Sequence, residues 1–147
     1  MLIAVHSVAG GIVGESLGNP VLAFLAGFVL HFILDAIPHE YEHDDKKMSV
    51  LDISLLIIDI IITVFVWQKY FGAGLNIESS FFWGALGGIF PDLLDNVPVL
   101  KLYFRKTKFG KAFHKFHGDI QNIIVGVLPG ALIQYGLLAL MIWYWVK

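Results

Sequence analysis

The chain has 147 residues, of which 57% are hydrophobic and 15% charged, and its formal net charge at pH 7 is −2. Its mean hydropathy of +0.74 is higher than a soluble globule of this length carries, so we expect a single integral-membrane domain over residues 1–147. Cysteine is absent, which excludes disulfides and thiolate metal sites. Any bound metal must therefore be held by imidazole and carboxylate.

Five apolar segments follow one another, each near the roughly 20 residues that cross a hydrocarbon core. They are Leu2–Leu17, Val21–Ile37, Val50–Phe71, Phe81–Leu100 and Ile120–Val146. The first is short and rich in glycine, which leaves a tilted or re-entrant course open. No basic residue precedes it and His6 and Glu15 interrupt it, so we expect a retained helix rather than a signal peptide. We predict an all-α, polytopic membrane bundle of about five transmembrane helices.

Lysine and arginine gather in two loops between these segments. With the amino terminus in the cytoplasm, the loops over residues 38–49 and 99–119 hold eight of the ten basic residues, as expected of cytoplasmic loops. The same orientation of the segments across the membrane places the candidate metal-ligand side chains at the cytoplasmic ends of the helices or just beyond them. These residues are His6, His31, Asp35, His39, His43, Asp92, Asp95, His114 and His117. The sequence therefore predicts a polar site on the cytoplasmic side.

Glycine and ionisable residues share helix faces, because residues three or four apart lie on one side of a helix. The stripes are His6–Gly10–Gly14–Gly18, Gly27–His31–Asp35 and Gly84–Gly88–Asp92–Asp95. Glycine at this spacing lets helix backbones approach closely in lipid, so these faces should meet and their polar ends converge. A glycine stripe alone indicates only packing, and a lone buried histidine is more often hydrogen-bonded than a ligand. Their combination with intramembrane carboxylates favours a functional site.

Residues 39–43, HEYEH, match the pattern in which two histidines one turn apart bind zinc and the glutamate between them acts as base. The match starts directly after Pro38, lies in a polar loop, and carries acidic residues where zinc proteases usually have uncharged ones. A zinc membrane protease that uses His39, Glu40 and His43 is therefore an alternative rather than the main prediction.

Three short motifs, with the early His6 and the glycine-rich first segment, resemble a known family. They are His31-x3-Asp35-x2-Pro38-His39, Phe90-Pro91-Asp92-x2-Asp95 and Phe113-His114-x2-His117. Together they look like the small bacterial membrane-bound metal-dependent hydrolases, whose function is largely predicted. The resemblance implies a bacterial inner-membrane location, with His6, the Pro-Asp-x-x-Asp carboxylates and the paired histidines as ligands. The family's later element is often a His-Arg-Gly-x-x-His run, from which the His114–His117 pair departs.

Hydrolysis is the reaction class that such a ligand set favours. Mixed imidazole and carboxylate ligands suit zinc above all, or manganese or iron, as one ion or two. Such a centre lowers the pKa of a bound water and polarises the bond under attack, while a spare carboxylate takes the proton. The predicted ligands are His6, His31, Asp35, His39, Asp92, Asp95, His114 and His117. Asp59 or Glu42 is the candidate base, or else a hydrogen-bonding partner of the ligands.

The segment Lys101–Lys115 has six basic residues, no acidic ones, and four interleaved aromatic residues. This composition attracts anionic headgroups or a phosphorylated substrate, although ordinary topology determination also explains it. Nucleic acid is not expected at a short membrane loop. A phosphoester or lipid-type substrate at the cytoplasmic leaflet is the resulting hypothesis.

The last segment carries Pro129 mid-span, where we expect a kink, and Asp119 is placed to cap its first turn. The competing function is non-enzymatic: a metal or proton transporter, or an assembly subunit whose buried charges pair with one another. The sequence is also compatible with a homo-oligomer.

Overall fold

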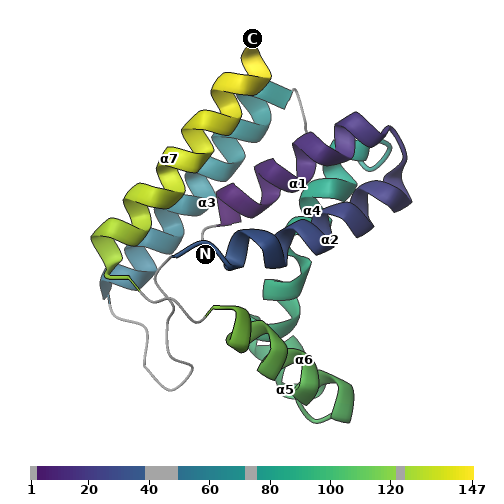
Figure 1. Cartoon of the computed structure of the whole chain (residues 1–147), viewed down its shortest axis with the longest axis vertical. Coiled ribbons are helices and arrows are strands. Elements are labelled where there is room, and N and C mark those ends of the chain that lie inside the picture. The colour runs from purple at the N-terminus through teal and green to yellow at the C-terminus, as the bar shows by residue number, and fades with distance from the viewer. Residues whose placement is uncertain (1–2, 39–49, 72–75, 122–124) are drawn as a thin grey trace.

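In the computed structural model, residues 3–38, 50–71, 76–121 and 125–147 are described, apart from the side chains of residues 51, 52, 70, 71 and 127. These residues form seven helices and no strand, which confirms the all-α prediction (Figure 1). The helices are α1 (Ile3–Leu17), α2 (Pro20–Asp35), α3 (Val50–Phe71), α4 (Ser80–Asn96), α5 (Pro98–Phe104), α6 (Lys108–Ile120) and α7 (Val127–Val146).

Helices α1, α2 and α4 pack against one another and form the centre of the molecule. Helices α3 and α7 both contact α1, with which they share a small apolar core of Ala4, Val5, Val8, Val66 and Leu138. Helices α5 and α6 lie below this assembly, at the carboxyl end of α4 (Figure 1). The carboxyl ends of α2 and α4 therefore point toward α6.

Local sequence signals set the helix boundaries around this centre. Gly18 ends α1 with a φ of 63°, a left-handed conformation that glycine adopts without strain, and a side chain there would meet nothing within 4 Å. Gly18 is therefore a helix terminator and not a packing residue of its stripe. Asn19 then caps α2, which begins with Pro20, and Ser79 caps α4.

The other glycines of the stripes hold the three central helices at backbone contact. A Cβ on Gly84 would collide with the carbonyl oxygen of Gly10, and one on Gly27 would collide with the carbonyl oxygen of Gly84. A Cβ on Gly88 would collide with the carbonyl oxygen of His6. The predicted convergence of these faces is confirmed: α4 packs against both α1 and α2, and a larger side chain at Gly27, Gly84 or Gly88 would prevent this contact.

The prediction of five spans is not supported. Among the described residues, only Leu128–Val146 of α7 is long and apolar enough to cross a membrane. Helices α1 and α2 have 15 and 16 residues, because the chain breaks at Gly18 and again after Asp35. At about 1.5 Å per residue both are shorter than a hydrocarbon core is thick.

Two predictions about residues 99–146 are wrong. Asp119 caps no helix: it lies inside α6 and forms an ion pair of 2.5 Å with Lys115. The kink expected at Pro129 is not needed, because α7 begins at Val127 and Pro129 falls in its first turn. Backbone N–H groups there have no partner within the helix, so proline costs nothing.

Gly84→Ala should disrupt the packing of α1 on α4. Its methyl group would meet backbone atoms of Gly10 and Gly14, which cannot rotate away, so we expect a loss of roughly 1–3 kcal/mol in stability. Gly136→Ala on α7 is the matched control, because its methyl group would meet nothing within 4 Å. Thermal unfolding of the purified variants measures both. Equal stability of the two variants would contradict the packing described here.

Candidate metal centre

Five side chains from four helices converge where α1, α2, α4 and α6 meet. They are His6 of α1, His31 and Asp35 of α2, Asp92 of α4 and His117 of α6. The side chains of His6, His31 and Asp35 are fully buried and that of His117 is 4% exposed, whereas that of Asp92 is 20% exposed. Among the described residues of the cluster, Asp92 therefore lies on the most exposed side, which we call its open side.

His31, Asp35 and His117 form a tight triangle of ligand-type atoms. The Nε2 atoms of His31 and His117 lie 3.0 Å apart, and Asp35 Oδ2 lies 3.1 Å from the first and 2.8 Å from the second. Ligands bonded to one ion at about 2.0–2.1 Å are roughly 3 Å from one another. Two imidazoles and one carboxylate at these separations fit a single transition-metal ion.

The second nitrogen of each imidazole holds its ring in this orientation. His31 Nδ1 lies 2.7 Å from the carbonyl oxygen of Gly88, to which it donates, so Nε2 is left as the atom that faces the triangle. His117 Nδ1 lies 3.4 Å from Asp95 Oδ2. Metal-binding histidines characteristically donate their other N–H to a carbonyl or carboxylate in this way.

His6 stacks on His31, with ring centroids 4.1 Å apart, and its Nε2 lies 3.2 Å from Asp35 Oδ1. Neither ring nitrogen makes a hydrogen bond with any described residue, although the side chain is fully buried. Buried polar atoms are nearly always hydrogen-bonded or bound to an ion. His6 thus lies beside the triangle, and its role as a metal ligand stays a prediction.

The possible ligand sets overlap in His31. One set is His31, Asp35 and His117, and the other is His6, His31 and Asp92. Since His31 Nδ1 is engaged by the Gly88 carbonyl, only Nε2 is left to bind an ion. The described residues therefore fit one ion better than the two that the sequence left open.

Asp95 and His114 lie one step outside this triangle. Asp95 accepts a hydrogen bond from Arg105 Nε at 2.8 Å and lies 2.8 Å from His114 Nδ1, besides its approach to His117. Arg105 also donates to the backbone oxygen of Asp95 at 3.0 Å. Asp95 is thus placed to orient His117 rather than to join the triangle, and His114 contacts Asp95 rather than the triangle.

His117 carries a perturbed pKa because carboxylates lie on both of its sides. Burial lowers the pKa, but hydrogen bonding with Asp35 and Asp95 and the charge of Asp92 raise it to about 9. A proton on His117 thus balances the carboxylates when no cation is bound. Metal binding at Nε2 displaces that proton.

Gln121 and Arg105 belong to the site although no sequence motif predicted them there. Gln121 Nε2 donates to Asp35 Oδ2 at 2.7 Å from one helical turn beyond His117. That spacing of four residues was a usable signal for Gln121. No comparable signal existed for Arg105, because its place depends on the turn between α5 and α6.

Other predicted site residues lie elsewhere. Asp59 accepts hydrogen bonds from the backbone N–H groups of Ile3 at 2.6 Å and Ala4 at 3.2 Å, so it caps the first turn of α1 from the neighbouring α3. It is not among the residues that the structure brings together at the triangle. His39 and Glu42, with the rest of the HEYEH pattern, fall outside the described residues.

Comparison of the chain with protein-family models, with curated proteins and with solved structures found no match. Any function proposed for the chain must therefore rest on the geometry of the site.

His117→Ala should abolish high-affinity binding of zinc, because it removes one corner of the triangle. Asp95→Asn should weaken binding by about 10- to 100-fold, since it loosens the orientation of His117. His114→Ala is the matched comparison and should weaken binding no more than Asp95→Asn does, because His114 contacts Asp95 and not the triangle. Titration against a fluorescent zinc chelator measures all three, with circular dichroism to verify folding. Equal loss in His114→Ala and His117→Ala would contradict the assignment.

Proposed function

We propose that this protein is a membrane-embedded, metal-dependent hydrolase that acts on an anionic phosphoester or lipid-type substrate. The observation that carries the proposal is the triangle of His31, Asp35 and His117, with separations of 2.8–3.1 Å and imidazoles held by their second nitrogens. It is a two-histidine, one-carboxylate arrangement open toward Asp92, as expected of a centre that binds both metal and substrate.

The distribution of polar and apolar side chains supports the membrane part of the proposal. The largest fully buried side chains include His6, His31, Asp35 and Asp59. Apolar residues cover the outside of α2, α3 and α7 instead, with Val29, Ile61 and Leu132 each more than half exposed. Water disfavours such a surface, whereas a bilayer accommodates it. Tryptophan and tyrosine at residues 143–145 suit the interface at one end of α7.

Four residues of the cluster have a part in the proposed reaction. A divalent transition-metal ion, when bound, supplies an acidified water and polarises the bond under attack. His31, Asp35 and His117 would hold such an ion, and Gln121 fixes Asp35 by its hydrogen bond. Of the five side chains in the cluster, Asp92 is the carboxylate on the open side. It would take the proton from the attacking water.

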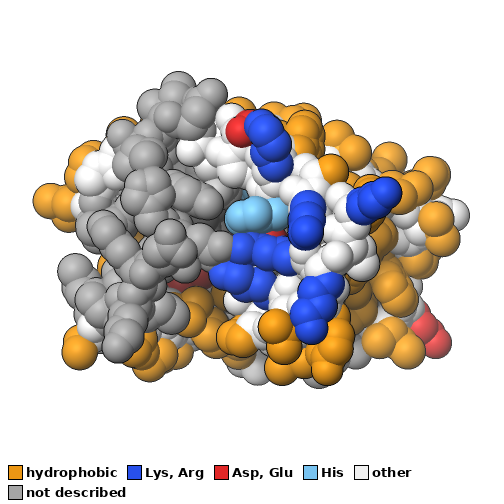
Figure 2. Space-filling view, turned by 90° about the horizontal axis from the view of Figure 1, so that it is seen from below, with side chains coloured by type: hydrophobic (Ala, Val, Ile, Leu, Met, Phe, Trp, Pro, Cys, Tyr) orange, Lys and Arg blue, Asp and Glu red, His pale blue; other side chains and the backbone are white. Residues whose placement is uncertain are grey.

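The charge around the opening favours an anionic substrate. Figure 2 shows Lys and Arg side chains gathered around a histidine on the face formed by α5 and α6. The basic residues of these helices and their connection are Lys101, Arg105, Lys106, Lys108, Lys111 and Lys115. Such a surface concentrates phosphate-bearing molecules near the site. The concentration of basic residues in this segment also favours the cytoplasmic side.

Asp92→Asn should separate metal binding from catalysis. We expect metal content close to wild type but a fall in kcat of about 100- to 10,000-fold, because the base is lost. Asp119→Asn, at an exposed carboxylate of α6, is the matched control and should retain activity. The measurement is hydrolysis of a panel of phosphoester and glycerophospholipid substrates by metal-loaded protein in nanodiscs.

Two outcomes would contradict the proposal. Full activity of Asp92→Asn would exclude it as the base. Metal-loaded wild type that hydrolyses no member of the panel, yet moves zinc across liposome bilayers, would identify a carrier instead.

A further inference from the structure

Helix α6 has three distinct faces rather than two. Successive residues are about 100° apart around a helix, so residues three and four apart line up. Lys108, Lys111 and Lys115 form one row, Phe109, Phe113 and Phe116 a second, and Gly110, His114 and His117 the third. The histidine row faces the metal centre, as the contacts of His114 and His117 with Asp95 show. The other two rows supply no candidate ligand to that site.

The phenylalanine row continues the apolar surface of α2. The ring of Phe116 lies 5.2 Å from that of Phe32, and the ring of Phe113 lies 5.9 Å from Phe32 and 6.4 Å from Phe28. At the other end of the row Phe109 is 71% exposed. A bilayer that covers α2 would therefore extend over this row without interruption.

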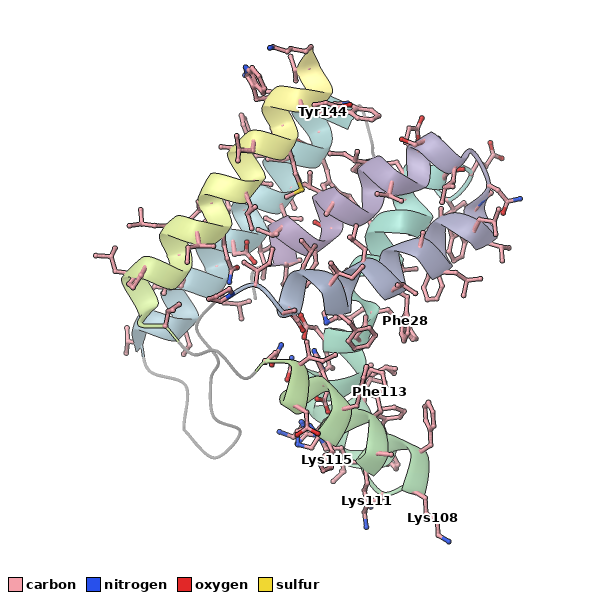
Figure 3. All side chains as sticks on the ribbon, viewed as in Figure 1. Phe28, Lys108, Lys111, Phe113, Lys115 and Tyr144 are labelled. Carbon is pink, nitrogen blue, oxygen red and sulfur yellow. The ribbon has the colours of Figure 1, made fainter. Side chains whose placement is uncertain are left out.

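The lysine row points away from α2. In Figure 3, Lys108, Lys111 and Lys115 project outward from α6, whereas Phe113 lies toward Phe28. Lysines beside exposed aromatic rings suit the boundary between acyl chains and headgroups, where the rings enter the lipid and the ammonium groups reach phosphates. Lys115 pairs with Asp119 on the same row, so Lys108 and Lys111 supply the positive charge that complements an acidic leaflet.

We propose that the α5–α6 arm docks on the anionic leaflet of the bilayer, with the phenylalanine row in the lipid and the lysine row among acidic headgroups. This inference rests on the proposed membrane embedding of the chain. The helix α5 adds to the docking surface, since Leu102 and Tyr103 are each more than half exposed and Lys101 and Lys106 flank them. Docking brings the open side of the metal centre to the level of lipid headgroups.

Spin labels at introduced cysteines test this directly, because the chain has no cysteine of its own. The labelled variants are Phe109→Cys on the phenylalanine row, Lys111→Cys on the lysine row and Leu140→Cys on the exposed side of α7. Full-length protein is placed in vesicles of phosphatidylcholine with or without phosphatidylglycerol. The accessibility of each label to oxygen and to a water-soluble nickel chelate gives its depth.

We expect the labels at residues 109 and 140 to be more accessible to oxygen, and the label at residue 111 to be more accessible to the nickel chelate. Phosphatidylglycerol should deepen the label at residue 109. Lys108→Gln combined with Lys111→Gln should remove that deepening, whereas Lys69→Gln combined with Lys147→Gln should not.

The label at residue 140 separates failure of this inference from failure of the membrane proposal. A label at 109 that stays in water while the label at 140 lies in lipid overturns the docking of the arm alone. Labels in water at both positions overturn the membrane embedding as well. If the depth of the label at residue 109 changes neither with phosphatidylglycerol nor with substitution of either lysine pair, the role of the lysine row is overturned.

Discussion

Backbone contact of α1 and α2 with α4 sets the position of the ligand side chains. Gly84 and Gly88 place α4 against the carbonyl groups of Gly10 and His6, so the three helix axes approach more closely than any other residue allows. His6, His31 and Asp92 extend from these same faces and therefore meet. The Gly88 carbonyl also orients His31, so one glycine serves both packing and ligand geometry.

A buried carboxylate among imidazoles requires a compensating positive charge. Asp35 is almost fully buried, and it lies within 3.2 Å of a nitrogen atom in each of His6, His31 and His117. Burial of a charge without a partner is costly, so either a proton on an imidazole or a metal ion must neutralise the cluster. The outer carboxylate Asp95, fixed by Arg105, holds His117 in the orientation that suits an ion at its other nitrogen.

Periodicity made much of this arrangement predictable. The apolar segments gave the positions of α1, α2, α3 and α4, and the glycine stripes gave their contacting faces. The number of membrane spans was not predictable from hydropathy alone, because Gly18 and the break after Asp35 shorten two helices. Whether Asp95 binds an ion or orients His117 depends on the turn between α5 and α6 that places Arg105. The spacing of residues along the sequence does not predict that turn. Asp59 shows the same limit, since a carboxylate that caps a neighbouring helix looks like a catalytic one in sequence.

Elemental analysis of the purified wild-type chain for zinc, manganese and iron is the most direct test of the metal centre. The triangle of His31, Asp35 and His117, with His31 shared between the possible ligand sets, predicts about one ion per chain. A folded chain that contains none of these metals, and takes up none when each is added, would contradict the account. The cluster would then be a network of buried ion pairs.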